Sequence, residues 1–497
     1  MNVGRTIDPA VQRVPDRVAL VVGDRRCTYR ELERWVGRIA TALAAGGVGA
    51  GDRVALVDNG SVLSVATILA AARIGAASAQ MNVELTVDEL GRLVAAVGAT
   101  VGVAGEPFRE RLAGAIGSGA LLGERDVDDV DGPQLSQAAG AVGDGDDEAL
   151  VLFTSGTTGL PKPISISHGV VDRRLAFYAA PIDPDAPQVT DMMSAPIFHI
   201  GGTLGLLISL HSGNKLVVLP RFDAGSWLRA VEEHGVSQTF VVPTMLQRIL
   251  DHPDFDSRDL SSLRQLSYGA AAAPVALVER ALDALPYVGF VNVFGQTETL
   301  GAYAALSAED HRRRHKLGSA GTALPGVELR IVDVAGADVA EDCAVGQVGE
   351  VWVRAAQNVS PDWLRTGDLA SIDDEGYLHP VGRLRDTINR GGEKFGPIEV
   401  EEVLRAHPGV RDAGVTGVPD AEMGQRVGAV VVVDGAIDAA DLRTFCAGRL
   451  ARYKLPDWIV FADDLPYSNL GKVSRAALAA VILDAREEET AHDALHA

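Results

Sequence analysis

The chain has 497 residues, of which 47% are hydrophobic and 23% are charged, so it can bury sizeable cores without covalent staples. A net charge of −22 argues against binding to nucleic acid or anionic lipid, and the three scattered cysteines argue against a disulfide framework. The N-terminus shows no apolar signal segment, and the most apolar stretch, 62–72, is about half the length of a membrane span. We therefore expect a cytoplasmic protein that holds any anionic ligand in a locally positive pocket.

Short apolar runs alternate with helical patterns along most of the chain. Strands are predicted over 52–59, 214–220 and 237–244, and helices over 61–76, over 226–235 with an end at Gly235, and from about Met245. This alternation is typical of α/β layers with largely parallel strands. Residues 140–149 predict a polar connector, and the tail from 485 predicts a frayed helix or a disordered segment.

The pattern changes near residue 385. A charged loop with a glycine pair, a helix beginning at Pro397, a strand over 428–435 and a helix over 441–456 are enough for a small α+β domain. We place the boundary between Leu384 and Arg385. The expected fold is therefore α/β, with a large N-terminal domain of layered α/β subdomains (1–384) and a small mobile α+β C-terminal domain (385–497).

The stretch LFTSGTTGLPKP (152–163) combines glycines, hydroxyl side chains and Lys162 directly after an apolar run. Glycines let backbone N–H groups approach a phosphate, while hydroxyls and lysine donate to it. The spacing does not match the GxxxxGK[ST] phosphate loop. On its own, the stretch is also compatible with a flexible loop.

The stretch FGQTETLG (294–301) sets the hydroxyl group of Thr297 beside the carboxylate of Glu298. A carboxylate next to a phosphate loop suits Mg²⁺, which prefers oxygen ligands. The alternative is a helix start capped by Thr297.

Two later stretches carry further candidates. In RTGDLASIDDEGYLHPVGRLRD (365–386), Asp368 follows a glycine and could accept hydrogen bonds from a ribose diol, while Arg383 could reach a phosphate. The alternative is a hairpin with a surface ion pair. In LPYSNLGKVSR (465–475), Lys472 is either a functional cation or a solvated charge.

In chain order, the motifs TSGTTG-x-PK, FH-x-x-G, G-x-TE, TGD, GR-x-x-D and a terminal L-x-x-G-K together resemble the acyl-adenylate-forming superfamily, over residues 10 to 480. That superfamily contains acyl-CoA synthetases, peptide-synthetase adenylation domains and luciferases. The resemblance implies that a carboxylic acid attacks ATP to give acyl-AMP, and that coenzyme A then displaces AMP. The expected cofactors and partners are ATP, Mg²⁺, coenzyme A and a small-molecule carboxylic acid, in fatty-acid or secondary metabolism, with a homodimer left open.

The resemblance also implies a role for individual residues of the large domain. The ATP phosphates would be wrapped by Thr154, Ser155, Gly156, Thr157, Thr158, Gly159 and Lys162. The rest of the nucleotide would lie against Gly269, Ala270, Ala271, Asn292, Phe294, Gly295, Gln296, Asp368 and Arg383. Phe294 stands where the superfamily usually has Tyr, so the stacking face is kept and a hydroxyl group is lost. In catalysis, Thr297 would touch the α-phosphate, Glu298 would hold Mg²⁺, and Lys472 would bridge the attacking carboxylate and the α-phosphate.

The acid and the thiol have implied sites as well. The acyl wall would consist of His199, Ile200, Gly201, Val242, Ala272 and Leu300, with Ile197 nearby. Its apolar, small side chains favour a bulky hydrophobic acid over acetate or an amino acid, although His199 read alone is also compatible with a packed core histidine. The small domain would turn at the hinge Arg385 and present Gly391, Gly392, Glu393 and Lys394 to coenzyme A.

Two features depart from the superfamily pattern. Pro163 follows Lys162 where glycine is usual, which removes one backbone N–H. The segment 351–369 is shorter than the pattern and lacks a Gly-Tyr stretch between Asn358 and Trp363. We interpret this as a lost surface excursion, with an altered face toward the small domain as the alternative. The alternatives to an acid–CoA ligase are a ligase that passes acyl-AMP to a carrier protein or a separate transferase, and a non-catalytic nucleotide-binding relative.

Overall fold

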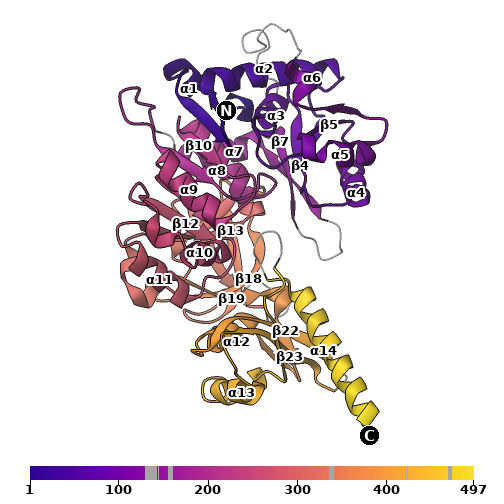
Figure 1. Cartoon of the computed structure of the whole chain (residues 1–497), viewed down its shortest axis with the longest axis vertical. Helices are drawn as coiled ribbons and strands as arrows, with labels where there is room; N and C mark the ends of the chain where they lie inside the picture. The colour runs from indigo at the N-terminus through magenta and orange to yellow at the C-terminus, as the bar shows by residue number, and fades with distance from the viewer. Residues whose placement is uncertain are drawn as a thin grey trace.

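The computed structural model describes residues 1–128, 143, 145–154, 161–178, 180–334, 341–420, 422–467 and 473–496. Of these, residues 128, 394 and 487–496 are described by their backbone alone. The described residues form four β-sheets, three in the large N-terminal part and one in the C-terminal part (Figure 1).

The sheet nearest the N-terminus has the strand order β6–β5–β3–β4–β7–β8. Its strands are β3 (Arg53–Val57), β4 (Ala77–Gln80), β5 (Val101–Ala104), β6 (Ala120–Leu122), β7 (Glu148–Thr154) and β8 (Lys162–Ser167). All neighbours pair in parallel except β7 and β8, which form an antiparallel edge. The accompanying helices are α2 (Tyr29–Ala45), α3 (Val62–Arg73), α4 (Val87–Val97), α5 (Arg109–Ile116) and α6 (Glu124–Asp128). Because α3 is buried from Val62 to Ala72, the most apolar stretch of the sequence is a core helix.

The largest sheet has the order β15–β14–β13–β12–β11–β9–β10–β1–β2. Its strands are β1 (Val18–Val22), β2 (Arg25–Thr28), β9 (Thr190–Met193), β10 (Lys215–Val218), β11 (Gln238–Val241), β12 (Gln265–Gly269), β13 (Gly289–Gln296), β14 (Gly301–Leu306) and β15 (Thr322–Ala323). The pairing is parallel from β1 to β13 and antiparallel at both ends. Its helices are α7 (His168–Leu175), α8 (Ile200–His211), α9 (Ala224–His234), α10 (Pro243–Leu250) and α11 (Val275–Ala284). Ligand sites of such sheets lie beyond the carboxyl ends of the parallel strands, here those of β12 and β13.

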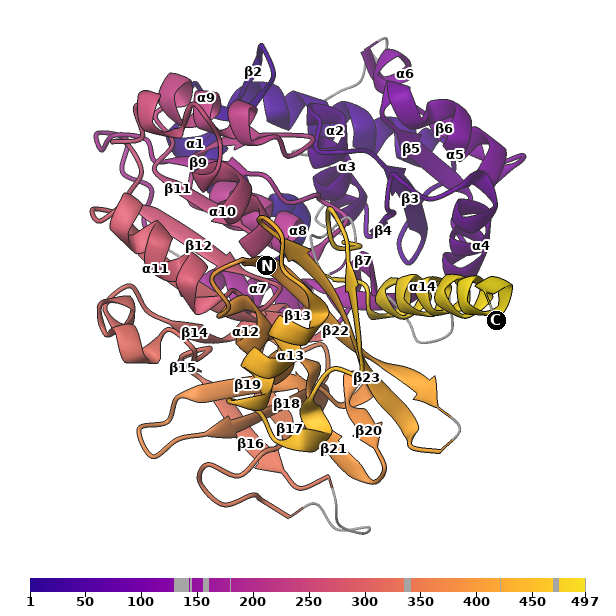
Figure 2. The same ribbon diagram turned by 60° about the horizontal axis from the view of Figure 1, so that its bottom comes forward.

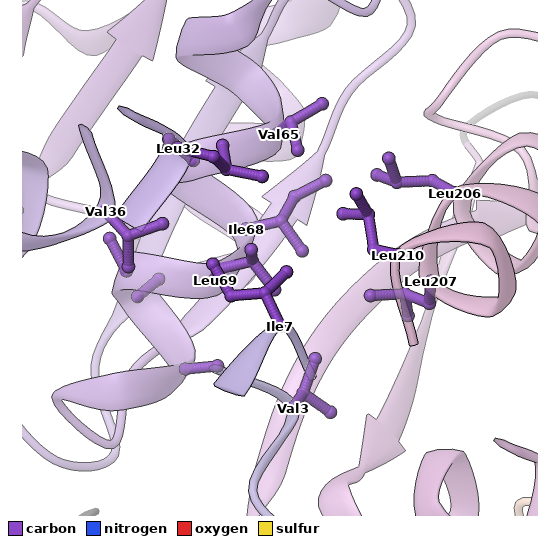
Figure 3. Packing of buried hydrophobic residues seen from close by; sticks show 14 of the residues in the cluster. Val3, Ile7, Leu32, Val36, Val65, Ile68, Leu69, Leu206, Leu207 and Leu210 are labelled. Carbon is purple, nitrogen blue, oxygen red and sulfur yellow. The ribbon is translucent and has the colours of Figure 1, made fainter. Parts of the chain in front are cut away.

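A single apolar cluster holds the N-terminal segment and α8 together. Around η1 (Val3–Arg5) and α1 (Asp8–Arg13), the side chains of Val3 and Ile7 meet those of α2 and α3 (Figure 3). Leu206, Leu207 and Leu210 of α8 close the cluster from the other side. One side of α8 is thus fixed by packing, and the opposite side is left to line a site.

The third sheet is antiparallel and leads into the small domain. Its strands are β16 (Val327–Val332), β17 (Gly349–Ala355), β18 (Leu364–Ile372) and β19 (Leu378–Arg383) in that order. The short helix η8 (Leu384–Asp386) then leads to the fourth sheet, ordered β21–β20–β23–β22 with β24 beside β23. Its strands are β20 (Ile388–Arg390), β21 (Glu393–Phe395), β22 (Val410–Asp420), β23 (Gly424–Val433) and β24 (Trp458–Phe461), with helices α12 (Pro397–Arg405), α13 (Ala439–Ala447) and α14 (Arg475–His496). Figure 2 shows this domain from below, with α14 along its edge.

The predicted α/β fold with a large and a small domain is confirmed. Helix α9 ends at the predicted glycine, because Gly235 adopts a left-handed φ of 62° at the C-cap, and α12 begins at Pro397 as predicted. The boundary between residues 384 and 385 stays a prediction.

Some predicted limits need correction. The helix expected over 441–456 is wrong in its second half: α13 ends at Ala447 before Gly448, and only the short turn η9 (Arg452–Lys454) follows. The connector expected over 140–149 ends earlier, since Glu148 already belongs to β7. The tail is helical to His496, as the frayed-helix alternative required.

Candidate active site

The predicted phosphate loop joins two antiparallel strands. Thr154 at the end of β7 and Lys162 at the start of β8 are direct cross-strand partners, so they flank the mouth of the loop. The calls on Ser155 and on Gly156 to Gly159 lie outside the described residues. Pro163 is accommodated because β8 is the edge strand of its sheet, where a missing N–H is tolerated.

The predicted adenine border lies at the carboxyl ends of β12 and β13. A side chain at Gly269 would collide with the Val293 carbonyl oxygen, because the two strands pair there in parallel register. The next residue, Ala270, has a positive φ of 65°, which is uncommon outside glycine. This turn leaves Ala270 exposed beside the half-buried Ala271. The chain thus presents bare backbone at the point where the purine is expected.

A continuous set of contacts links the aromatic ring to the carboxylate. The rings of Phe294 and Tyr303 meet edge to face, with centroids 5.3 Å apart. The Tyr303 hydroxyl donates to Oδ2 of Asp368 at 3.4 Å, and Arg383 Nε donates to Oδ1 at 2.9 Å. Burial, followed by the neighbouring Asp368 charge, raises the pKa of Tyr303 well above its ordinary value, so Tyr303 remains a donor. The structure therefore brings the predicted stacking residue and the predicted ribose residue into one group.

The Asp368–Arg383 pair also tests the alternative interpretation of its stretch, a hairpin with a surface ion pair. The two residues are cross-strand neighbours in the β18–β19 hairpin, as that interpretation required. The pair is not a surface ion pair, however, because Asp368 is only 5% exposed. Arg383 therefore already binds the Asp368 carboxylate. To bind a phosphate as predicted, the guanidinium group would have to share this contact or give it up.

Tyr303 was missed by the sequence reasoning. It lies on β14 outside every recognised motif and is completely buried. Only the strand pairing, which sets Phe294 opposite Ala304, brings it beside the site. No local sequence signal would have identified it.

The Thr297–Glu298 turn follows directly on β13. Gln296, and not Thr297, occupies the N-cap of η5 (Thr297–Thr299), so the alternative of a helix capped by Thr297 is wrong. Gln296 Nε2 is buried and has no hydrogen-bond partner among the described residues, which leaves a donor for a ligand. Asn292, by contrast, donates weakly to the Ser319 carbonyl at 3.4 Å.

The shortened segment packs on this turn. The Val359 N–H donates to the Glu298 carbonyl at 3.0 Å, and Asn358 is buried and donates to the Val353 carbonyl at 3.1 Å. The guanidinium groups of Arg330 and Arg354 lie 5.4 and 4.8 Å from the centre of the Trp363 ring. These contacts all lie within residues 298–363, and the interpretation as a lost surface excursion stays a prediction.

Three residues of the predicted acyl wall, His199, Ile200 and Gly201, lie at the start of α8. His199 forms its N-cap, with its ring 4.6 Å from that of Phe198, and Gly201 is exposed beside the Phe240 ring. Leu300 differs from the expectation, since it is 1% exposed and packs in the large apolar cluster. The other members are the buried Val242, the exposed Ala272 and the half-buried Ile200.

The predicted small-domain residues lie in a hairpin and in the short helix η8. Gly391 and Gly392 are the two turn residues between β20 and β21, and their φ angles of 61° and 99° are those that such a turn requires. The flanking Glu393 begins β21, and the side chain of Lys394 lies outside the described atoms. Arg385 lies in η8 with Nε 3.7 Å from Asp386. Lys472 falls outside the described residues.

The residues present fit a nucleotide with its metal. No group of three or more His, Cys, Asp or Glu side chains among the described residues could hold a metal alone. Mg²⁺ in such sites is usually held by one or two carboxylates together with substrate phosphates, which fits a single carboxylate such as that of Glu298. A glycine-backed turn, an aromatic ring, a buried carboxylate and a lysine at the loop mouth together fit an adenylate-forming enzyme.

Comparisons with known proteins give the same class. The family model described as AMP-binding enzyme matches residues 7–361, and its C-terminal domain model matches residues 399–472. The chain therefore belongs to the AMP-binding enzyme family, which confirms the resemblance found in its motifs.

Similar proteins match over almost the whole chain. A feruloyl-CoA synthase from Amycolatopsis is 36% identical over 485 residues, covering 92% of this chain and 94% of the relative. An indoleacetate–CoA ligase from Aromatoleum aromaticum is 34% identical, covering 96% and 97%. Among solved structures, the amide bond synthetase McbA from Marinactinospora thermotolerans is similar with a TM-score of 0.85 at 28% identity, covering 96% and 99%.

Proposed function

We propose that the protein activates a bulky hydrophobic carboxylic acid (aliphatic, alicyclic or aromatic) with ATP and transfers the acyl group to coenzyme A. The observation that carries the substrate class is the exposed side of α8. Gly201 and Gly205, one helical turn apart, both expose their backbone there. A Cβ atom on Gly205 would meet nothing within 4 Å, and one on Gly201 would lie 3.5 Å from the Phe240 ring. Bare helix backbone facing an aromatic ring suits a large, flat apolar body.

The relatives support the same chemistry. The feruloyl-CoA synthase and the indoleacetate–CoA ligase described above act, by their names, on aromatic acids and coenzyme A. A further relative from Mycobacterium tuberculosis, 32% identical over 474 residues, is a long-chain-fatty-acid–CoA ligase. The protein is accordingly an AMP-forming acid–thiol ligase that uses ATP, Mg²⁺ and coenzyme A.

The reaction has two displacements. In the first, an oxygen of the carboxylate forms a bond to the α-phosphorus while the bond to pyrophosphate breaks, and charge builds on the phosphate oxygens. Bound Mg²⁺ would neutralise part of this charge near Glu298. Lys472 and Thr297 would hold the reacting oxygens, while Asp368 and Phe294 would fix the nucleoside. In the second, the thiol sulfur bonds to the acyl carbon, its proton is lost, and AMP leaves.

Pyrophosphate release tests this proposal. We expect the highest kcat/KM for aromatic, alicyclic or long aliphatic acids, and the lowest for acetate and amino acids. Gly205→Leu should fill the space on α8 and lower kcat/KM for bulky acids by at least about tenfold, while the ATP KM is unchanged. Gly205→Ala serves as the graded control. If acetate or an amino acid gave the highest kcat/KM, the proposed substrate class would be wrong.

The acceptor is tested by repeating the assay with and without coenzyme A. Acyl-AMP that persists at saturating coenzyme A would favour transfer to a carrier protein, an alternative supported by a fatty acid–[acyl-carrier-protein] ligase from Streptomyces coeruleorubidus that is 30% identical over 494 residues. An absence of pyrophosphate release with every acid would instead favour a non-catalytic relative.

Location and assembly are further parts of the proposal. No helix in the described part of the chain is both long and apolar enough to cross a membrane. We propose a cytoplasmic enzyme, with a homodimer to be tested by sedimentation.

A further inference from the structure

A buried arginine stands on α7, close to the acyl wall. Arg174 is 4% exposed and lies on the inward face of the helix, where Val170 and Val171, one turn earlier, and the adjacent Leu175 are apolar. The helical period predicts an apolar residue at this position. A charged residue that breaks such a pattern without a local reason is typical of a functional position.

The rotation of α7 is fixed, so Arg174 is held inward. His168 at the first position of the helix is completely buried, and its Nδ1 accepts a hydrogen bond from the Val3 N–H at 3.0 Å. Ser167 caps the helix by accepting from the Val170 N–H. A rotation of the helix that turned this face outward would disrupt both anchors.

The guanidinium group has no protein partner of opposite charge. Among the described residues, the Arg174 guanidinium group makes no hydrogen bond and no ion pair, and its Nε is buried and unsatisfied. Its recorded neighbour is the ring of Phe177 in η3 (Ala176–Tyr178), 6.0 Å away. Burial lowers the pKa of Arg174 from its ordinary value, and the nearby Tyr178 opposes this only in part. A buried charge without a partner is destabilising, so a partner from outside the chain would relieve the cost.

The guanidinium group lies close to residues that adjoin the acyl wall. A Cβ atom on Gly301 would lie 3.7 Å from Arg174 Nη2 and 2.9 Å from Leu204 of α8. Gly301 has a φ of 92° and follows Leu300, while Leu204 lies one turn beyond Ile200 on α8. Helices α7 and α8 are in contact (Figure 1). Because residue 301 is a glycine, it places no side chain between the guanidinium group and Leu204.

We propose that Arg174 binds an oxygen acceptor at the end of the acid remote from its reacting carboxyl group, such as a phenolic oxygen or a second carboxylate. Arg174 is then a specificity-determining residue, and the preferred acid has an apolar body with a polar far end. This inference rests on the proposed function and narrows its substrate class.

Matched pairs of acids test the inference by pyrophosphate release. Each matched set has one body, phenylacrylic, phenylacetic or long aliphatic. Its three members differ only at the far end, which carries a methyl, a hydroxyl or a carboxylate group. In the wild type we expect the oxygenated member to have a kcat/KM about tenfold or more above that of the methyl analogue, as for a hydrogen bond to a charged group. In Arg174→Met this ratio should fall to about one, and in Arg174→Gln it should fall further for the carboxylate than for the hydroxyl group.

Arg173→Met is the matched control, because Arg173 is the exposed neighbour and donates to the Ala356 carbonyl. It should leave the ratio unchanged. The thermal midpoint of Arg174→Met should not fall below that of Arg173→Met, because no ion pair is lost.

The outcomes separate the two proposals. Pyrophosphate release without discrimination in the wild type, or a ratio that persists in Arg174→Met, overturns the role of Arg174 and leaves the proposed function standing. Arg174→Met could fail to fold. In that case, a wild type without preference for the oxygenated acids shows that Arg174 is structural. If the wild type does prefer these acids, the kcat/KM ratios of Arg174→Gln decide the role of Arg174. No release from any acid refutes the proposed function itself.

Discussion

Replacing Asp368 by asparagine should weaken ATP binding while leaving the fold intact. The side chain keeps its size, and its amide oxygen can still accept from Arg383 Nε, now 2.9 Å from Oδ1. What is lost is the negative charge and one acceptor oxygen. A ribose diol donates two hydrogen bonds, and an amide can accept them at only one of its two terminal atoms.

The magnitude follows from the number and type of these bonds. A hydrogen bond to a charged group contributes about 1.5–3 kcal/mol, so one lost bond raises the ATP KM by about 10- to 150-fold. The thermal midpoint should fall as well, because Asp368 is only 5% exposed and the substitution removes the charge that pairs with Arg383. The Arg383 side chain is 36% exposed, so water can replace part of the lost contact and the variant should still fold.

The assay is pyrophosphate release over a range of ATP concentrations, with AMP binding by calorimetry and a thermal midpoint for each variant. Asp373→Asn is the control. This carboxylate directly follows β18, five residues after Asp368, and accepts from His379 Nε2 at 2.9 Å. It should lower stability without changing the ATP KM. An unchanged ATP KM in Asp368→Asn, or an equal rise in both variants, would refute the assignment of Asp368 to the ribose.

Three further outcomes are expected. Lys472→Ala should lower acyl-AMP formation by about a hundredfold or more while ATP binding persists. If this variant released pyrophosphate at the wild-type rate, Lys472 would have no catalytic role. Gly392→Leu should accumulate acyl-AMP and form little acyl-CoA in a rapid-quench time course. Gly392→Ala, which shares the strain of a 99° φ without the bulk, should form both products. An equal loss of both steps in Gly392→Leu would contradict a small domain that presents Lys472 for adenylation and the Gly391–Gly392 turn for thioester formation. Burial, helped by Glu31, raises the pKa of the Cys27 thiol to about 12, so its thiolate forms only above that pH. Ellman's reagent should therefore label the half-exposed Cys343 first and reach Cys27 and the buried Cys446 only after denaturation; rapid labelling of Cys27 at pH 8 would contradict the burial.

Local spacing predicted the parts of the site that the backbone itself builds. The hairpin that pairs Asp368 with Arg383 was the alternative interpretation of its stretch, because glycines and alternating strand residues fix turns and cross-strand partners within one stretch of chain. The pairing of Thr154 with Lys162 was not predicted. The predicted end of the helix over 441–456 was wrong, because Gly448 is a helix stop signal and ends α13.

Residues that join the site through tertiary packing could not be found in this way. Tyr303 reaches Asp368 only because β13 and β14 pair in one register, while Arg174 is identified by its burial without a partner. Leu300 lies in the right motif, yet its side chain turns into the core, because its positive φ of 46° reverses the chain there.

The acid-binding and nucleotide-binding parts of the proposed site are held by different parts of the fold. Arg174 and Gly205 lie on α7 and α8, which are anchored by the N-terminal apolar cluster, whereas the nucleotide candidates lie at the ends of β12 and β13 and within β18. Substitutions at Arg174 or Gly205 therefore need not disturb the strands that hold the nucleotide. A duplicated copy of such a protein could diverge toward a new acid through few mutations, each tolerated on its own, while selection for ATP use continued without interruption.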